Sequence, residues 1–461
     1  MKTLNTTIAV LGGGPAGYAA AIRAAQLGAE VVLIEEKEIG GVCLNIGCIP
    51  TKALLKTAET GTVIKKSKEF GIESSMSKID WNVSVGRKNR VVKNLNTGVE
   101  QLLAFHGVNI VKGRGTVVNE KKLVVATSEE EVCVNCEKII LAAGAEPMLP
   151  PVKGIHLDAV MTSNEALSMG ELPESMVIIG AGVIGLEFAT MLAPLGVKIT
   201  MIECKDRILP GEDEEIASEL QKLMKRQGIT FKLSARVTEI EKTENGLTVH
   251  YDMGDKACVI SCSKVLAAVG RKLNSDKFSN LTLHIENGAV VTDERMETNV
   301  KGIYAAGDLT GNKLLAHLAF MEGKIAAENA FGLESRMDYV AVPSCVYTNP
   351  EVAAVGMTEE EAKRAGISVK AGRFQFRNNG RALTLGEREG FVKVIANEKN
   401  EIIGGQILGV NASEMISELT LAIKLKAKAG DLADMIHPHP TLSEAIWEAC
   451  GDIMGKALHK I

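Results

Sequence analysis

The ten residues 8–17, IAVLGGGPAG, are the starting point for predicting the fold of this chain. The apolar first half predicts a buried strand, and the pattern Gly-x-Gly-x-x-Gly after it predicts a tight turn into a helix. That helix ends near Gly28, a second apolar run follows at residues 31–34, and Glu35 closes the unit. This order of elements is typical of a βαβ unit that binds a dinucleotide.

The same pattern returns at residues 177–185, VIIGAGVIG, followed by a helix to about Gly196, a strand at 198–202 and Glu203. The acid lies 23 residues after the first glycine in both copies, since 35 − 12 and 203 − 180 agree. One glycine triplet is weak evidence, but two copies in the same context indicate two dinucleotide sites. The glycines let the backbone approach a pyrophosphate at a helix N-terminus, and the acid accepts hydrogen bonds from ribose hydroxyls. The two sets are Gly12, Gly14, Gly17 and Glu35, and Gly180, Gly182, Gly185 and Glu203.

The composition of the chain is that of a globular protein and argues against nucleic-acid-binding and membrane proteins. The 461 residues correspond to about three domains, and contents of 46% hydrophobic and 24% charged residues are ordinary for a globular protein. A net charge of −5 without a long basic run argues against nucleic acid as a partner. Residues 1–7 lack the features of a signal peptide, and the apolar window 177–202 is interrupted by Glu187, Pro194 and Lys198. We therefore expect no membrane association and a cytoplasmic location.

Residues 40–52, GGVCLNIGCIPTK, hold two of the nine cysteines, Cys43 and Cys48. A thiol pair beside a redox cofactor can pass two electrons between a disulfide and that cofactor. The five-residue spacing differs from the i, i+4 spacing of a regular helix, so we expect a distorted helix start. A zinc site would need two more Cys or His ligands, and none lies nearby. The other close pairs, Cys133 with Cys136 and Cys258 with Cys262, are interpreted as apolar filler.

The rest of the chain completes the domain organisation. Strand ends at residues 141–144 and 265–271 close the two repeats, and residues 302–308 form a strand before a long helix to about Phe331. From about Tyr339 the composition shifts to alternating strands and later helices. We predict an α/β fold with two Rossmann-like dinucleotide-binding domains and a C-terminal α+β domain. The predicted bounds are 1–145 and 271–338 for the first domain, 146–270 for the second and 339–461 for the third.

These motifs, with Ala-Gly-Asp at 306–308 and His-Pro-His-Pro-Thr-Leu-Ser-Glu at 437–444, resemble the class I pyridine nucleotide–disulfide oxidoreductases over essentially the whole chain. Within that class the dihydrolipoamide dehydrogenases are most similar. The resemblance implies a redox disulfide in which Cys43 exchanges with substrate sulfur and Cys48 forms a thiolate–flavin charge-transfer complex. It implies FAD in the first site, in contact with Gly12, Gly14, Gly17, Glu35, Lys52, Gly115, Gly144, Asp308 and Ala316. The alternatives are NAD in that site and a simple capping role for Asp308.

The second site is expected to hold NAD. A carboxylate at Glu203 repels a 2′-phosphate, which favours NAD over NADP, although Lys205 and Arg207 lie close enough in sequence to receive that phosphate. Glu187 is expected to approach Lys52 near the flavin, and its alternative is a polar residue on an exposed helix face. The full set implied by the resemblance is Gly180, Gly182, Gly185, Glu187, Glu203, Val237 and Gly270.

His439 is the candidate base, because thiol–disulfide exchange needs a thiolate and an imidazole can take and return that proton. Glu444 is expected to hold the histidine ring and also to close a capping box, Thr-Leu-Ser-Glu, at a helix start. His437 is a rival base. By resemblance, the C-terminal domain is a dimerisation domain whose histidine completes the active site of the other subunit of a homodimer.

The expected reaction is oxidation of dihydrolipoamide by NAD⁺, with the lipoyl group carried by an acyltransferase lipoyl domain or a glycine cleavage H protein. Mercuric reductase is disfavoured because Cys450 is single near the C-terminus, and glutathione or trypanothione reductase because Glu203 is acidic. A flavoprotein that mainly docks in a multienzyme assembly is a further alternative. Two departures from the family, Ala143 before Gly144 and a short loop at residues 35–40, leave the redox pair untouched.

Overall fold

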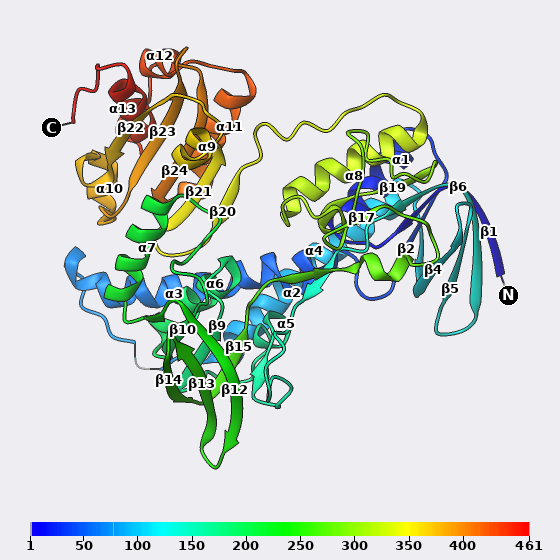
Figure 1. Ribbon diagram of the computed structural model, residues 1–461, viewed down its shortest axis with the longest axis horizontal. Helices are drawn as coiled ribbons and strands as arrows, with labels where there is room; N and C mark the ends of the chain where they lie inside the picture. The colour runs from blue at the N-terminus through cyan, green and yellow to red at the C-terminus, as the bar shows by residue number, and fades with distance from the viewer. Residues whose placement is uncertain (1, 77, 461) are drawn as a thin grey trace.

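The structure, a computed structural model, describes residues 2–76 and 78–460. It has three lobes (Figure 1): the N-terminal residues share one with helix α8 (Ala316–Phe331), the green middle of the chain forms the second, and the orange-to-red residues form the third. The predicted mixed α/β class is confirmed. The lobes follow the predicted order of units, whose exact bounds stay a prediction.

The first lobe is built on a seven-stranded sheet in the order β3-β2-β1-β6-β5-β4. β6 pairs with β5 through its first half, and the short strand β19 pairs with its second half, returning the chain to this sheet after the second lobe. The glycine turn follows β1 between β2 and β6, at the carboxyl edge of the sheet. The strands are β1 (Lys2–Leu11), β2 (Val31–Glu35), β3 (Asn109–Lys112), β4 (Arg114–Asn119), β5 (Lys122–Ala126), β6 (Glu131–Leu141) and β19 (Ile303–Ala305). The helices are α1 (Pro15–Gln26), α2 (Gly41–Ile46), α3 (Cys48–Lys66), η1 (Ser67–Phe70), α4 (Trp81–Phe105), η4 (Gly307–Thr310) and α8.

Small residues bring α1 and α8 together behind the first glycine turn. α1 has the sequence PAGYAAAIRAAQ, and a Cβ atom added at Gly323 of α8 would lie 2.1 Å from the carbonyl oxygen of Ala16. Two backbones this close leave no room for a larger residue at position 323. The contact holds the N-terminal end of α1, which follows the glycine turn, against the middle of α8.

The second lobe repeats the architecture with a parallel sheet in the order β11-β10-β9-β15-β8 and an antiparallel meander, β12-β13-β14. The window 177–202 is a buried strand–helix–strand unit, as predicted. Its strands are β8 (Val160–Met161), β9 (Ser175–Ile179), β10 (Lys198–Ile202), β11 (Thr230–Lys232), β12 (Ala235–Thr243), β13 (Gly246–Met253), β14 (Lys256–Cys262) and β15 (Lys264–Ala267). Its helices are α5 (Ser163–Ala166), α6 (Val183–Leu192), η2 (Ala193–Leu195) and α7 (Glu214–Arg226). A ribbon of β7 (Ala145–Pro147) and β16 (Arg271–Leu273) joins the first two lobes, followed by η3 (Asn274–Phe278), β17 (Ile285–Glu286) and β18 (Ala289–Val290).

The third lobe is an antiparallel sheet in the order β20-β21-β24-β23-β22, with α11 packed on β21 and β24 and α13 on β22 and β23. The predicted strands near residues 352–355, 391–395 and 402–409 are present. The strands are β20 (Ser344–Val346), β21 (Glu351–Gly356), β22 (Val369–Gln375), β23 (Phe391–Asn397) and β24 (Ile402–Gly409). The helices are α9 (Glu359–Arg364), η5 (Phe376–Asn378), α10 (Gly380–Leu385), α11 (Ala412–Lys424), α12 (Ala429–Ala433) and α13 (Glu444–Ile453).

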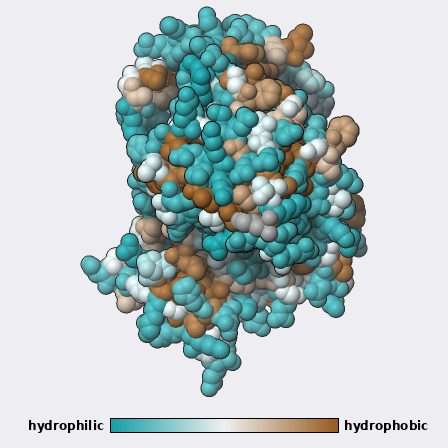
Figure 2. Space-filling model, turned by 90° about the vertical axis from the view of Figure 1, so that its right-hand side faces the viewer, coloured by the Kyte–Doolittle hydropathy of each residue, from teal (hydrophilic) through white to brown (hydrophobic). Residues whose placement is uncertain are grey.

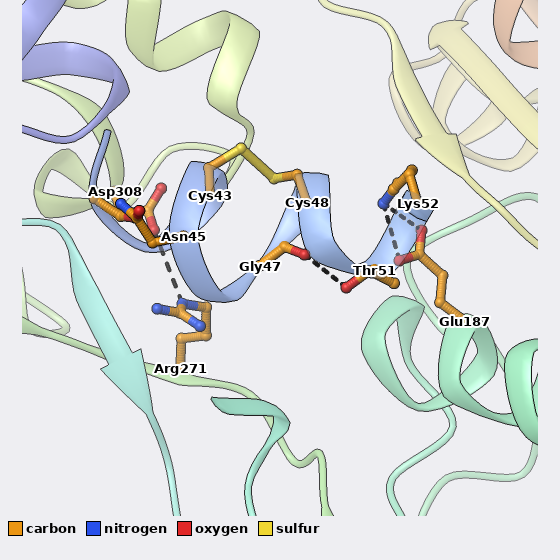
Figure 3. Close-up of a disulfide and its surroundings, with 10 residues drawn as sticks. Cys43, Asn45, Gly47, Cys48, Thr51, Lys52, Glu187, Arg271 and Asp308 are labelled. Carbon is orange, nitrogen blue, oxygen red and sulfur yellow. Dashed lines mark hydrogen bonds and ion pairs between the residues drawn. A yellow bond between two sulfur atoms is a disulfide. The ribbon is translucent and has the colours of Figure 1, made fainter. Parts of the chain in front are cut away.

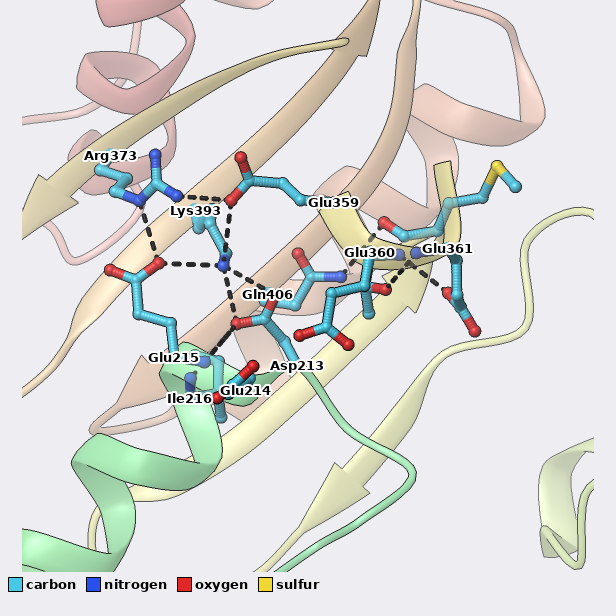
Figure 4. A network of polar contacts seen from close by, with 12 residues as sticks. Asp213, Glu214, Glu215, Ile216, Glu359, Glu360, Glu361, Arg373, Lys393 and Gln406 are labelled. Atoms are coloured by element: carbon cyan, nitrogen blue, oxygen red, sulfur yellow. Dashed lines mark hydrogen bonds and ion pairs between the residues drawn. The ribbon is translucent and has the colours of Figure 1, made fainter. Parts of the chain in front are cut away.

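A buried ionic cluster joins the second and third lobes (Figure 4). Lys393 of β23 lies 2.7 Å from both carboxylate oxygens of Asp213 and 3.0 Å from Glu215 at the start of α7. The Lys393 and Asp213 side chains are only 2% and 4% exposed. Arg373 contacts Glu215 and Glu359, so the cluster also reaches α9. Since Asp213 is also the N-cap of α7, one residue both begins that helix and anchors it to the third lobe.

Polar side chains dominate the face shown in Figure 2, where hydrophobic residues gather in scattered groups. No helix within the described ranges is long and apolar enough to cross a lipid bilayer.

Candidate active site

The two glycine turns have the same geometry, and in both of them nearby backbone carbonyl oxygens leave no room for a side chain. Gly12 and Gly180 have φ values of +106° and +103°, and a Cβ atom at either would lie 2.3 or 2.4 Å from a carbonyl oxygen of the neighbouring strand end. Gly17 and Gly185 are crowded by the carbonyl oxygen of the first glycine in their own turn, at 1.7 and 2.3 Å. The fold itself therefore requires the first and third glycines of each pattern, whether or not a ligand is bound.

The middle glycines differ, and this difference points to ligands. A Cβ atom at Gly182 would meet nothing within 4 Å, and the nearest atom to one at Gly14 would be the Cα of Gly41 at 3.9 Å. Neither α1 nor α6 has a side-chain cap on its first N–H groups. An open approach to free N–H groups at a helix N-terminus fits a pyrophosphate. Both turns therefore suit the dinucleotides that the sequence predicts.

The two predicted ribose acids make matching hydrogen bonds. Glu35 accepts the N–H of Gly13 at 2.6 Å and the N–H of Lys37 at 2.7 Å. Glu203 accepts the N–H of Ala181 at 2.7 Å and the N–H of Lys205 at 2.8 Å. The two copies of the sequence pattern thus make equivalent hydrogen bonds, and these bonds fix each carboxylate beside its glycine turn.

The remaining predicted FAD residues come from distant segments. Gly115 of β4 packs against Leu11 and Ile34, at the strand ends that flank the first turn. Gly144 has φ +64° with open space beyond it, and Ala316 begins α8. Asp308 lies in η4, where its Oδ2 is 3.9 Å from the guanidinium of Arg271 (Figure 3). Burial raises the pKa of Asp308, and Arg271 opposes that rise.

Cys43 and Cys48 form a disulfide, with their Cα atoms 4.7 Å apart (Figure 3). Cys43 lies in α2 and Cys48 begins α3, because the helix breaks at Gly47. The Thr51 hydroxyl donates to the Gly47 carbonyl at 2.6 Å and holds the break. The expectation of a distorted helix start at this pair is confirmed.

Lys52 links this helix to the second lobe and the third. Its Nζ lies 2.9 Å from both carboxylate oxygens of Glu187, a 4%-exposed residue of α6, and 4.4 Å from the ring centre of Tyr347. The N–H of Tyr347 donates to Glu187 at 3.1 Å. The interpretation of Glu187 as an exposed helix-face residue is therefore wrong, and its approach to Lys52 is confirmed. Lys52, one turn beyond the disulfide in the first lobe, is held by residues of the second and third lobes.

His439 is paired with Glu444, as predicted, at 2.8 Å between Nδ1 and Oε1. Its side chain is 78% exposed, and no contact found in the described residues joins it to Cys43 or Cys48 of the same chain. The second oxygen of Glu444 accepts the Thr441 N–H at 2.8 Å. Although burial opposes it, these hydrogen bonds lower the pKa of Glu444, which keeps its carboxylate ionised.

The predicted capping box at residues 441–444 is wrong in one respect. α13 begins at Glu444 itself with Ser443 as the N-cap, and the Thr441 hydroxyl donates to the Pro438 carbonyl instead. Glu444 still reaches back to the Thr441 N–H, so half of the box forms. Thr441 therefore lies before the helix and not at its cap.

His437 is unsuited to act as the base. Its side chain is 3% exposed, its Nε2 lies 2.9 Å from Glu418, and its Nδ1 lies 3.2 Å from the Met435 carbonyl. Both ring nitrogens are occupied, so no position is left for a substrate thiol. Of these two histidines, only His439 has a ring nitrogen at the surface that no other described residue contacts.

The structure places the two other close cysteine pairs in strands, and Val237 and Gly270 in the second lobe. Cys133 and Cys136 are free and buried in β6, where burial raises the pKa of Cys136 to about 12. Of the pair in β14, Cys262 is buried and Cys258 half-buried, and both are free. Val237 is buried at a bulge in β12, and Gly270, with φ +128°, opens the ribbon back to the first lobe.

Glu322 is a site residue that the sequence interpretation missed. This α8 carboxylate is 1% exposed and accepts the Gly307 N–H at 2.8 Å, directly before Asp308. It also accepts hydrogen bonds from Thr310, Asn312 and Tyr339, and burial outweighs them to raise its pKa. It fixes the loop that carries Asp308. A glutamate within an apolar helical stretch was the only sequence signal.

Comparisons with known proteins agree with this geometry. A family model described as pyridine nucleotide-disulphide oxidoreductase matches residues 6–323, and the model for that family's dimerisation domain matches residues 342–450. The chain belongs to this oxidoreductase family. Dihydrolipoyl dehydrogenases from Bacillus subtilis and Geobacillus stearothermophilus are 39% and 40% identical, with 98% and 99% of this chain and 98% of each relative covered.

Solved structures show the same family architecture. LpdA from Mycobacterium tuberculosis has a TM-score of 0.90 at 26% identity, covering 98% of this chain and 99% of that one. The Cu(II) complex of the HOCl-induced flavoprotein disulfide reductase RclA from Escherichia coli has a TM-score of 0.87 at 29% identity, covering 97% and 99%. The predicted α+β domain is the family's dimerisation domain, which supports a homodimer.

Proposed function

We propose that this chain is a dihydrolipoyl dehydrogenase that oxidises dihydrolipoamide to lipoamide and reduces NAD⁺. The observation that carries the proposal is the Cys43–Cys48 disulfide, which opens α3 beside the first glycine turn and is followed one turn later by the Lys52–Glu187 pair. The relatives named dihydrolipoyl dehydrogenase support this substrate, because they match over nearly the full length of both chains. FAD at the first turn would supply the two-electron relay between the thiols and NAD⁺ at the second.

The residues divide the chemistry as follows. His439 removes a proton from one thiol of dihydrolipoamide, and the thiolate attacks Cys43 and breaks the Cys43–Cys48 bond. The second substrate thiol then attacks the mixed disulfide, which releases the cyclic disulfide of lipoamide and leaves Cys43 and Cys48 reduced. Glu444 holds the His439 ring through Nδ1, so the other nitrogen faces the substrate. Overall, a dithiol and NAD⁺ give a disulfide, NADH and a proton.

The predicted cofactor contacts form part of the proposal. For FAD these are Gly12, Gly14, Gly17, Glu35, Lys52, Gly115, Gly144, Asp308 and Ala316, and for NAD Gly180, Gly182, Gly185, Glu187, Glu203, Val237 and Gly270. The open space at Gly14 and Gly182 and the uncapped helices support both sets.

The protein partner that we propose follows from the chemistry of the proposed substrate. Dihydrolipoamide is carried on a lipoyl domain, either of an acyltransferase or of a glycine cleavage H protein, and we propose such a domain as the docking partner of the homodimer. Seven cysteines are free in the described part of the chain, which is typical of a reducing compartment, so we propose the cytoplasm.

The proposal is tested by mixing the purified flavoprotein anaerobically with dihydrolipoamide and NAD⁺ and following NADH formation. We expect rapid NADH formation that is lost in Cys48→Ser, retained in the matched control Cys258→Ser, and much slower with NADP⁺. Absence of turnover, while NADH still reduces the disulfide, would reject dihydrolipoamide as the substrate and leave the family assignment intact. Other disulfides and metal ions would then be tried as acceptors.

A further inference from the structure

Tyr347 lies where the three lobes meet, and it makes two separate contacts with one ion pair. The residue follows β20 of the third lobe, and the pair joins Lys52 of α3 to Glu187 of α6 (Figure 3). The backbone N–H of Tyr347 donates to Glu187 at 3.1 Å. Its ring lies against the Nζ atom of Lys52, with 4.4 Å between Nζ and the ring centre. One residue therefore contacts the anion through its backbone and the cation through its ring.

The contact between this ring and Lys52 is a cation–π interaction. An ammonium group within about 6 Å of the ring centre is attracted by the negative face of the ring. The two carboxylate oxygens of Glu187, each 2.9 Å from Nζ, hold the ammonium from another direction. Burial is the largest of the effects that raise the pKa of Tyr347, so its phenol is neutral at neutral pH. The ring thus acts on Lys52 through its face and not through a net charge.

The ring restrains a side chain that has an alternative position. The Lys52 side chain is 32% exposed, whereas that of Glu187 is 6% exposed. Lysine has a flexible four-carbon stem and a strongly hydrated ammonium, so without a restraint Lys52 would turn toward water for part of the time. The ring of Tyr347 favours the arrangement on Glu187. The position of the Lys52 charge therefore depends on a residue of the third lobe.

The position of this charge matters for reduction of the disulfide. Lys52 lies one turn after Cys48 in α3 and is one of the proposed FAD contacts. NADH and the disulfide give NAD⁺, one thiol and one thiolate, and the thiolate beside the flavin is expected at Cys48. The protein thus gains a negative charge when it is reduced. A cation that is held close to this charge stabilises the reduced protein.

We propose that Tyr347 is a positioning residue of the redox site: its ring holds the Lys52 ammonium on Glu187 and thereby favours the two-electron-reduced protein. This inference rests on the proposed function in taking the first glycine turn as the flavin site. It does not depend on the identity of the dithiol substrate.

The test titrates the flavin-loaded protein anaerobically with mixtures of NADH and NAD⁺ and follows the thiolate–flavin charge-transfer absorbance. The NADH to NAD⁺ ratio at half reduction gives the equilibrium constant for reduction of the disulfide. Tyr347→Phe keeps the ring and is expected to keep the wild-type constant. Tyr347→Leu is expected to lower the constant by roughly twofold to thirtyfold, the range for one cation–π contact.

A second variant separates the charge distribution of the ring from its shape. Pentafluorophenylalanine, introduced at position 347 by nonsense suppression, has nearly the shape of phenylalanine, but fluorine reverses the sign of the ring quadrupole. It is expected to lower the constant at least as much as Tyr347→Leu does. The comparison of this variant with Tyr347→Phe decides the question even if Tyr347→Leu does not fold.

Two controls show whether the effect passes through the cation. In a double-mutant cycle, Tyr347→Leu is expected to cause no further change when Lys52→Met is already present. Phe374→Leu removes a buried ring from β22, at the opposite edge of the same sheet, and is expected to keep the wild-type constant.

Three results would each overturn the proposal. An unchanged constant in Tyr347→Leu would show that the ring does not affect the redox site. Equal constants for Tyr347→Phe and the fluorinated variant would show that only the shape of the ring matters. An undiminished effect of Tyr347→Leu in the Lys52→Met background would show that Tyr347 does not act through the cation. The titration contains no dihydrolipoamide, so rejection of that substrate would leave the outcome of this test unchanged.

Discussion

Two histidines two residues apart have opposite roles, which the structure separates by burial. His439 has one ring nitrogen on Glu444 and the other free at the surface. His437 is buried with both nitrogens engaged. A base must reach the proton it removes, so only His439 meets that condition in this chain.

We expect His439→Gln to lower kcat/KM for dihydrolipoamide by roughly 10²- to 10⁴-fold, the usual contribution of a general base. Reduction of the disulfide by NADH in a single turnover should continue, because it does not need a substrate proton removed. The matched control is His437→Gln, which is expected to reduce stability and to leave kcat/KM within a few-fold of wild type. Steady-state and stopped-flow absorbance measure both quantities. Similar losses of kcat/KM in the two variants would contradict the assignment.

The His437–Glu418 pair predicts a pH dependence of stability. The Glu418 carboxylate raises the pKa of His437 in the folded protein. Its stabilisation is fully present below the unfolded pKa of histidine, about 6.5, and is lost as the pH rises through the raised folded value. We expect wild type to exceed Glu418→Gln in urea midpoint at pH 6 and the difference to shrink by pH 9. A difference that is constant with pH would show that the pair is not ionic.

At the scale of elements, the start of α7 depends on a residue of β23. Asp213 caps α7 and pairs with Lys393, whose pKa is raised by Asp213 and Glu215 despite the opposing effect of burial. A raised lysine pKa means that this stabilisation persists through neutral pH and is lost only in strong alkali. The cluster therefore holds the second and third lobes together at neutral pH and up to strong alkali.

Lys393→Met is expected to destabilise the protein by about 3–5 kcal/mol, because it leaves the buried Asp213 carboxylate without its cation. Adding Asp213→Asn should recover part of the loss, since asparagine still caps α7. The exposed pair Lys222–Glu219 provides the control, and Lys222→Met should change stability by less than about 1 kcal/mol. Calorimetric unfolding measures the three variants. A Lys393→Met loss no larger than that of Lys222→Met would refute the role of the cluster.

At the scale of the whole molecule, the catalytic parts do not meet within one chain. The disulfide opens α3 near the junction of the lobes, whereas His439 lies exposed on the dimerisation domain. A homodimer in which each histidine serves the other subunit's disulfide would complete two equivalent sites. In such a dimer, a subunit that lacks its cysteine and a subunit that lacks its histidine would together still form one intact site.

Cys48→Ser and His439→Gln are each expected to be inactive as homodimers. Co-refolded at equal amounts, random pairing makes half of the dimers mixed, and each mixed dimer has one site with both residues intact. We therefore expect about a quarter of wild-type activity from the mixture. If each subunit used its own histidine, the mixture would stay inactive. Two different affinity tags, one on each variant, and two successive affinity steps would confirm that mixed dimers had formed.

Many features of the fold and of the site could be predicted from the sequence, because they depend on residues that lie close together along the chain. The two glycine turns, the acids 23 residues on and the disulfide pair are short-range features whose geometry is confined to one βαβ unit or one helix start. Tertiary structure alone brought together residues that lie far apart in sequence, such as Glu322 with Gly307 and Glu187 with Tyr347. It also decided between His437 and His439, and it moved the start of α13 to Glu444. Burial and long-range pairing are set by the packing of whole elements, and no local pattern encodes them.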